Sequence, residues 1–179
     1  MWQAEAEIVT DAQTSRETLC REQYPRILRL CRLLLMDVQE AEEVTQEVFE
    51  KLLRQWRSDP MIRSWEAWLT RVAVNACHDR RRSGWWKWWR SGRIESLSEE
   101  PQHSQSTPEE QVLSREQQRR LWGRFRQLSP RQREVFVLRR LEGLSTEETA
   151  HLLAVTTGSV KRHLFHAIQH LQKVLGDHS

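Results

Sequence analysis

The sequence predicts an all-α protein in which a flexible linker joins two small helical domains. Glycine and proline are scarce, with 6 Gly and 5 Pro in 179 residues, and no alternating apolar run is bounded by turn residues as a half-buried strand would be. Apolar residues instead recur at helical spacing in two blocks, and a polar stretch without that period separates them. We therefore expect an N-terminal tail at 1–15, domains at 16–90 and 111–179, and a linker at 91–110.

The first block is expected to hold three helices. A leucine-rich pattern predicts a helix at about 16–36, interrupted at Pro25 because proline lacks the N–H group that a helix interior requires. The same period predicts a second helix at about 38–57. After the break at Ser58-Asp59-Pro60, a third helix is expected at about 65–82.

The second block carries helix-capping residues at its expected boundaries. Ser129 and Ser145 each stand three residues before a Gln or Glu, which is the spacing of a capping box. Gly143 is placed to end one helix, and Thr156 is placed to begin the last. These signals predict helices at about 112–127, 130–142, 146–153 and 157–174.

Composition and charge exclude several classes of protein. The 28 Lys+Arg and 25 Asp+Glu give a net charge of +3, and the apolar run from Ile27 to Met36 contains Arg29 and Arg32, so no membrane span is expected. The first residues are acidic where a signal peptide is basic, which favours the cytoplasm. Because nucleotide-binding, hydrolase and metalloprotease motifs are missing, we expect neither an enzyme nor a cofactor.

The cysteines do not indicate a cross-linked or metal-bound fold. Cys20, Cys31 and Cys77 form no CxxC pair and are odd in number. Buried thiols are therefore expected, and a metal site that uses Cys77-His78 with scattered histidines is the less favoured alternative.

The second helix is expected to have two different faces. At about 100° per residue, one side is apolar, with Val44, Val48, Phe49, Leu52 and Trp56. The opposite side carries Glu43, Gln46, Glu47 and Glu50. Charge on a helix face is most often only solvated, and the functional alternative is a docking face for a basic partner.

The third helix combines a core stripe with a basic side. Its apolar residues recur at helical spacing: Trp65, Trp68, Leu69, Val72, Ala73 and Ala76. The other side aligns Arg71, Asn75, His78 and Arg82, and Arg80 and Arg81 add further charge. This arrangement suits contacts with phosphates and base edges, and a solvated basic face is the alternative.

Four tryptophans follow the third helix, where Trp85, Trp86, Trp88 and Trp89 flank Lys87. Interleaved indoles and cations can stack on unpaired bases, pack back onto the first domain, or anchor at a membrane surface. The surrounding charge is polarised, because residues 78–93 hold six Lys/Arg and one Asp, whereas residues 94–110 hold five Glu and no Lys/Arg.

Residues 147–170 have the pattern of a helix-turn-helix. Ala150 stands where two helices must approach closely, and a turn is expected at Leu153-Ala154-Val155. The second helix would point Lys161, Arg162, Phe165, His166 and Gln169 outward, as a helix that enters a major groove does. A hairpin that serves only as a protein interface is the alternative.

Four segments stand on either side of the expected linker: AEEVTQEVF at 41–49 and WLTRVAVN at 68–75 before it, LSPRQREV at 128–135 and LEGLSTEETA at 141–150 after it. Together they resemble the conserved regions of bacterial sigma factors of the extracytoplasmic-function (ECF) group, in the family's order. The sequence departs from the family pattern at Glu43, where many members have Asp, and at Ala154, a turn position that often carries Gly.

The resemblance implies an alternative sigma factor that binds core RNA polymerase and directs it to promoters. The clamp helices of the largest polymerase subunit would be bound by Glu43, Gln46, Glu47 and Glu50. The −10 element would be met by Arg71, Asn75, His78, Arg80, Arg81 and Arg82, with a loop at 55–64 completing a pocket for a flipped base. The −35 element would be met by Ser159, Lys161, Arg162, Phe165 and His166.

The resemblance also implies further contacts and partners. The polymerase flap would be a second contact, the linker would follow the RNA exit path, and an anti-sigma factor, often membrane-linked, would cover the polymerase-binding faces. Two alternatives stay open. A stand-alone helix-turn-helix regulator of duplex DNA has no use for the acidic face of the second helix, and a protein-interaction adaptor predicts no DNA dependence for Lys161 or Arg162.

Overall fold

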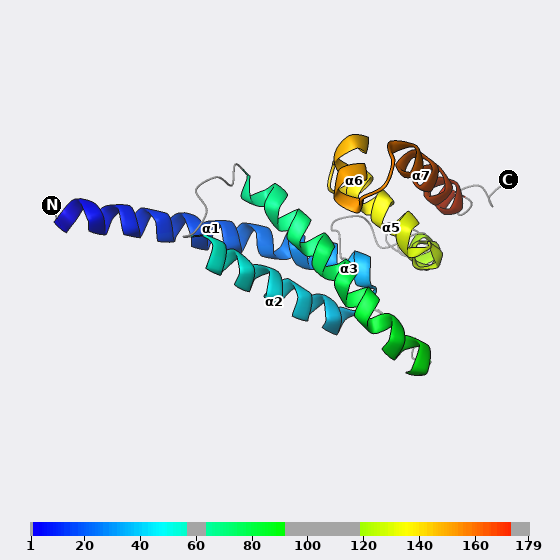
Figure 1. Ribbon diagram of the computed structural model, residues 1–179, viewed down its shortest axis with the longest axis horizontal. Helices are drawn as coiled ribbons and strands as arrows, with labels where there is room; N and C mark the ends of the chain where they lie inside the picture. The colour runs from blue at the N-terminus through cyan, green and yellow to red at the C-terminus, as the bar shows by residue number, and fades with distance from the viewer. Residues whose placement is uncertain (1, 57–63, 92–118, 173–179) are drawn as a thin grey trace, which may run out of the picture. The chain divides into compact units, whose positions relative to one another are not determined.

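The computed structural model describes the backbone of residues 2–56, 64–91 and 119–172, and the side chains of 16–56, 64–83 and 119–172. Every regular element within these ranges is helical, which confirms the predicted fold class. The chain forms two compact units, Met1–Glu95 and Ser96–Ser179. Figure 1 shows the helices of each unit.

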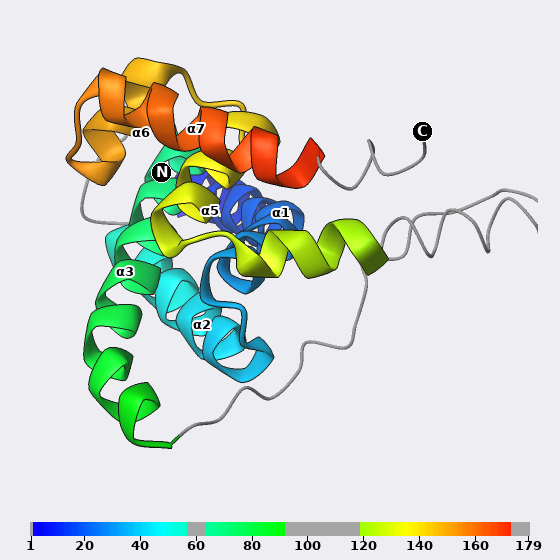
Figure 2. The same ribbon diagram turned by 90° about the vertical axis from the view of Figure 1, so that its right-hand side faces the viewer.

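The first unit is a bundle of three helices, α1 (Trp2–Leu35), α2 (Val38–Gln55) and α3 (Trp65–Ser91). Helix α2 returns antiparallel to α1, and α3 runs back across both, so each helix packs against the other two (Figures 1 and 2). Each helix contributes buried apolar side chains to the shared core, among them Ile27, Leu30, Leu34, Val44, Val48, Leu52, Leu69 and Val74. The apolar stripe predicted for α2 therefore faces the core, with only Trp56 half-buried. In the stripe predicted for α3, Leu69, Ala73 and Ala76 are buried, whereas Trp65, Trp68 and Val72 are half-buried.

Two arginines of α1 form hydrogen bonds to the other two helices of the first unit. Arg26 donates to Thr70 Oγ1 at 3.0 Å and to the Glu66 carbonyl at 3.1 Å, which joins α1 to α3. Arg32 donates to Glu42 Oε1 at 2.9 Å, which joins α1 to α2. These contacts fix the helix surfaces that point away from the core.

Helices α1 and α3 are longer than the sequence predicts. Helix α1 begins at Trp2 and continues through Pro25, because the burial of Ile27 and Leu30 just beyond outweighs a proline penalty of ~3 kcal/mol. Helix α3 continues to Ser91, since the one helix-breaking residue there, Gly84, costs only ~1 kcal/mol. The segment 85–89, predicted to follow the third helix, therefore lies on α3. Its side chains lie outside the described ones.

The second unit contains a helical segment at 119–127, α5 (Pro130–Phe136), the π-helix η1 (Val137–Leu141), α6 (Thr146–Leu153) and α7 (Thr157–Gln172). Helix α7 packs against α5 and α6. The core that they enclose contains Phe125, Val135, Leu138, Leu153, Val160, Ala167 and Leu171.

The single helix predicted at 130–142 is divided in the structure. Beyond Phe136 the backbone widens into the π-helix, where the Glu142 N–H donates to the Val137 carbonyl at 3.0 Å. Gly143 then ends the segment with φ 72°, a conformation that glycine adopts without strain.

The predicted capping residues are confirmed. Ser129 and Ser145 each form a complete capping box at the start of α5 and α6. Thr156 Oγ1 accepts a hydrogen bond from the Ser159 N–H at 3.1 Å at the start of α7.

Candidate partner-binding and DNA-binding surfaces

The acidic face of α2, defined as Glu43, Gln46, Glu47 and Glu50, points away from the core. Asp37 begins the helix by accepting a hydrogen bond from the Glu40 N–H at 2.8 Å, and the opposite side of α2 is buried. All four residues of the acidic face are exposed. Gln46 Nε2 lies 3.3 Å from Glu50 Oε1, and Arg54 lies 3.8 Å from the other Glu50 oxygen.

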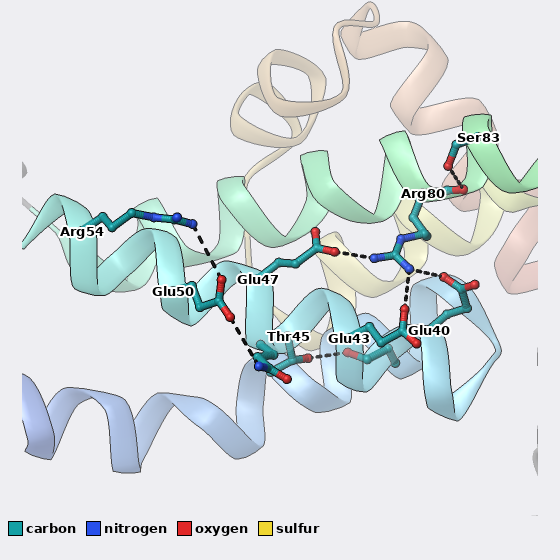
Figure 3. Close-up of polar contacts among 10 residues, drawn as sticks. Glu40, Glu43, Thr45, Glu47, Glu50, Arg54, Arg80 and Ser83 are labelled. Carbon is teal, nitrogen blue, oxygen red and sulfur yellow. Dashed lines mark hydrogen bonds and ion pairs between the residues drawn. The ribbon is translucent and has the colours of Figure 1, made fainter.

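Arg80 of α3 reaches across to α2 and binds three carboxylates, as Figure 3 shows. Its Nη1 donates to Glu40 Oε2 at 2.8 Å and to Glu43 Oε2 at 2.7 Å, and its Nη2 donates to Glu47 Oε1. The hydrogen bond with Glu43 raises the pKa of the Arg80 guanidinium above its ordinary value, while burial opposes that rise. We call Arg80, Glu40, Glu43 and Glu47 the Arg80 cluster.

Arg80 therefore differs from the other cations predicted for the DNA-facing side of α3. It lies nine positions after Arg71, which at about 100° per residue is half a turn away. Helical geometry separates it from that side, and the carboxylates of α2 stand where it points. The angular position of Arg80 can be predicted from the sequence. Its carboxylate partners cannot, because they lie on another helix.

The basic stripe of α3, defined as Arg71, Asn75, His78 and Arg82, lies on the side away from the core. Arg71, Asn75 and Arg82 are exposed, and His78 is half-buried. Arg81, predicted to extend this charge, is also half-buried. The structure thus gathers four of the six predicted residues on one side of α3, where amide and guanidinium donors are available to phosphates and base edges.

A group of aromatic rings holds the two ends of the segment between α2 and α3. Trp56 stacks on Trp65 with 4.7 Å between ring centroids, and Trp68 meets Trp65 edge-on at 5.6 Å. The three indoles are half-buried rather than fully enclosed. Residues 57–63, which make up most of the loop predicted to complete a base-binding pocket, lie outside the described residues.

Helices α6 and α7 form the predicted helix-turn-helix. Ala150 is buried where the helices approach, and the Val155 N–H donates to its carbonyl at 3.0 Å. Ala154 occupies the turn with φ 52° and ψ 48°, the left-handed conformation that glycine adopts more readily. This backbone conformation explains why the family that the sequence resembles often has glycine at the position of Ala154.

The outward side of α7 carries the predicted set of polar and aromatic side chains. Lys161, Arg162, Phe165 and His166 are exposed, and Ser159 is half-buried beside the helix start. Phe165 is 56% exposed, which leaves a large apolar surface next to the cations Lys161 and Arg162. Such a surface suits contact with phosphates and with the thymine methyl group.

The cysteine thiols are free, with Cys31 and Cys77 buried and Cys20 half-buried. A hydrogen bond with Cys31, reinforced by burial, raises the pKa of the Cys77 thiol, so that group stays neutral. Among the described residues, His, Cys, Asp and Glu form no group that could hold a metal ion. No helix in the described ranges is long and apolar enough to cross a membrane.

Comparisons with known proteins match both units. The family model for sigma-70 region 2 matches residues 19–87, and the model for sigma-70, region 4 matches residues 118–171. The RNA polymerase sigma-E factor of Streptomyces coelicolor is 30% identical over 159 residues, which cover 89% of this chain and 85% of that protein. The ECF RNA polymerase sigma factor SigW of Bacillus subtilis is 28% identical over 157 residues, covering 85% of this chain and 84% of that protein.

A solved structure has a similar fold. The sigma factor RpoE from Bartonella quintana, in complex with the anti-sigma factor NepR, aligns with a TM-score of 0.69 at 22% identity. The alignment covers 91% of this chain and 98% of that chain. At this sequence identity, the structural similarity shows a shared fold and no more.

Proposed function

We propose that this chain, which belongs to the ECF group of the sigma-70 family, binds core RNA polymerase through the acidic face of α2 and promoter DNA through α3 and α7. Members of the family are non-enzymatic transcription initiation factors, so the chain is an alternative sigma factor that directs core RNA polymerase to promoters. What we propose in addition is which side chains perform each step.

The acidic face of α2 is the observation that carries the proposal. Its side chains are exposed while the other side of the helix is buried, so the carboxylates are available to a basic surface such as the clamp helices of the largest polymerase subunit. Complementary charge of this kind speeds association and sets orientation. A stand-alone DNA-binding regulator has no use for such a face.

The basic stripe of α3 is proposed to meet the −10 element. Asn75 is exposed between Arg71 and Arg82, so an amide that can pair with a base edge stands between two cations that can bind phosphates. Extruding a base costs a few kcal/mol of stacking. Phosphate contacts on either side of the amide would help to offset that cost.

The outward side of α7 is proposed to meet the −35 element. An exposed helix that carries Lys161, Arg162, Phe165 and His166 has the dimensions and donors that major-groove recognition requires. The charges are local and the net charge is only +3, so DNA binding by the chain without polymerase should be weak and steeply salt-dependent.

An anti-sigma factor is a further proposed partner, and the cytoplasm is the proposed location. The similar structure of RpoE was solved in complex with the anti-sigma factor NepR. A protein that covers the acidic face of α2 would prevent polymerase binding until it is released.

The test is run-off transcription with bacterial core RNA polymerase, on promoters selected from a random-sequence library with the reconstituted holoenzyme. Gln46→Lys and Glu47→Lys place positive charge on the acidic face and should abolish initiation by weakening core binding. Glu17→Lys, the same change at an exposed position of α1, should leave initiation intact. Sequence-specific duplex binding by the chain alone, with no initiation by the wild type, would establish the regulator instead.

A further inference from the structure

The Arg80 cluster connects the two surfaces that the proposed function uses. Arg80 belongs to α3, the helix of the basic stripe, yet every contact described for its guanidinium leads to α2. Two of its three partners, Glu43 and Glu47, belong to the acidic face. The third, Glu40, lies one turn earlier on the same helix, outside the acidic face.

The cluster is layered, with the cation inside and the carboxylates outside. The Arg80 side chain is 24% exposed, whereas those of Glu40, Glu43 and Glu47 are 44%, 51% and 47% exposed. A carboxylate has two oxygens that accept hydrogen bonds, and Arg80 contacts one oxygen of each. The carboxylates can therefore receive a second donor from outside while Arg80 holds them.

Charge balance favours such a second donor. Three carboxylates around one guanidinium leave a local excess of negative charge, so a cationic partner is still attracted. Without Arg80, carboxylates spaced three and four residues apart on one helix would repel one another and spread apart. The planar guanidinium presents several donors in a fixed arrangement, which a lysine ammonium does not.

We propose that Arg80 is a positioning residue of the polymerase-binding surface and not a DNA contact, and that Glu40 belongs to that surface. Arg80 holds Glu40, Glu43 and Glu47 in one arrangement, and basic side chains of core RNA polymerase dock against their outer oxygens. The proposal rests on the proposed function, because it extends the acidic face by one turn toward the start of α2 and names the residue that orders it.

The test measures two affinities for each full-length variant: that of the labelled chain for core polymerase, and that of the assembled holoenzyme, at saturating chain, for promoter DNA. Arg80→Gln should weaken core binding about tenfold and Glu40→Gln about threefold, with Arg80→Lys between wild type and Arg80→Gln. Promoter affinity of the assembled holoenzyme should stay unchanged in all three. Arg82→Gln, on the exposed basic stripe, is the matched control and should show the reverse pattern.

A double-mutant cycle separates positioning from a merely structural role. If Arg80 acts through Glu47, then Arg80→Gln combined with Glu47→Gln should weaken core binding by clearly less than the product of the two single effects. Glu40→Gln keeps Arg80 in place, so it tests the surface even if Arg80→Gln is poorly folded.

Three results would overturn the proposal: unchanged core affinity in Glu40→Gln, strictly multiplicative effects in the double-mutant cycle, or weakened promoter binding by Arg80→Gln holoenzyme at normal core affinity. If Gln46→Lys still weakens core binding in those cases, the proposed function stands and only the role of Arg80 fails. If neither Gln46→Lys nor Glu47→Lys affects core binding, the proposed function itself fails.

Discussion

Arg80 in the first unit and Arg133 in the second both reach across to a neighbouring element, but they donate to different kinds of acceptor. Arg80 reaches three carboxylates that are about half-exposed. Arg133 is buried and donates to the backbone carbonyls of Arg126 and Leu128 at 3.3 and 3.1 Å. Its guanidinium also lies 6.0 Å from the centroid of the Phe125 ring.

The difference separates two uses of the same side chain. Backbone carbonyls near a helix end need donors wherever the fold buries them, so Arg133 completes the packing of the 119–127 segment against α5. Side-chain carboxylates on a solvated helix need no such partner, so Arg80 arranges a surface instead. Substitution of Arg133 should therefore affect mainly the stability of the second unit, and substitution of Arg80 should affect mainly binding by the first.

The largest expected effect is that of Arg133→Ala. It removes a buried guanidinium and its hydrogen bonds to the Arg126 and Leu128 carbonyls, the second of which is buried, so the free energy of unfolding of the second unit should fall by about 3 kcal/mol. Arg80→Gln should cost the first unit less than about 1 kcal/mol, because its ion pairs are partly solvated. Chemical denaturation, with hydrogen exchange resolved by segment, measures both, and exposed Arg162→Ala serves as the control. Equal losses of unfolding free energy in the two units would contradict the proposed difference between Arg133 and Arg80.

Arg162→Glu tests whether the second unit also has a binding surface of its own. Reversing an exposed charge on the outward side of α7 should reduce promoter-specific transcription at least tenfold, since lost base or phosphate contacts are worth about 1–3 kcal/mol each. Core binding should not change, in contrast to Gln46→Lys. The same reversal at exposed Arg140, outside α7, is the control. Unchanged transcription from Arg162→Glu would remove α7 from DNA recognition.

Two residues with positive φ test how far backbone geometry determines the second unit. Ala154 has φ 52° and Gly143 has φ 72°. Ala154→Gly should stabilise the unit by about 0.5–1 kcal/mol, and Gly143→Ala should destabilise it by about 1 kcal/mol. A Cβ at Gly143 would meet no atom within 4 Å, so strain is the only expected cause. Thermal unfolding of both variants measures the opposite shifts, and shifts of the same sign would show that another factor dominates.

The sequence predicted best those features whose partners lie within one helical turn. The capping boxes at Ser129 and Ser145 and the cap at Thr156 form as expected because the acceptor and donor are three residues apart. The apolar stripes of α2 and α3 were predicted for the same reason, since helical spacing alone decides which residues share a face.

Features that depend on packing or on distant partners were missed. The π-helix after Phe136 shifts its hydrogen bonds by one residue, and no residue type there signals that shift. The continuation of α1 through Pro25 depends on burial against two other helices. Arg80 could be separated from the basic stripe by its angle on the helix, but its three carboxylates are 33 to 40 residues away in sequence.

The smallest expected effect concerns pH and again lies in the second unit. Burial, followed by the charges of Arg162 and Arg131 and by His166, lowers the pKa of His163 in the folded chain. The unfolded chain then binds the proton more readily, so the stability that neutral His163 contributes is fully present above the ordinary pKa of about 6.5 and declines as pH falls below it. Unfolding of His163→Gln should therefore depend less on pH between about 7 and 5 than that of the wild type. The Arg80 guanidinium stays charged throughout that interval, so the Arg80 cluster predicts no change in stability there. A pH dependence of unfolding confined to the first unit would count against the assignment to His163.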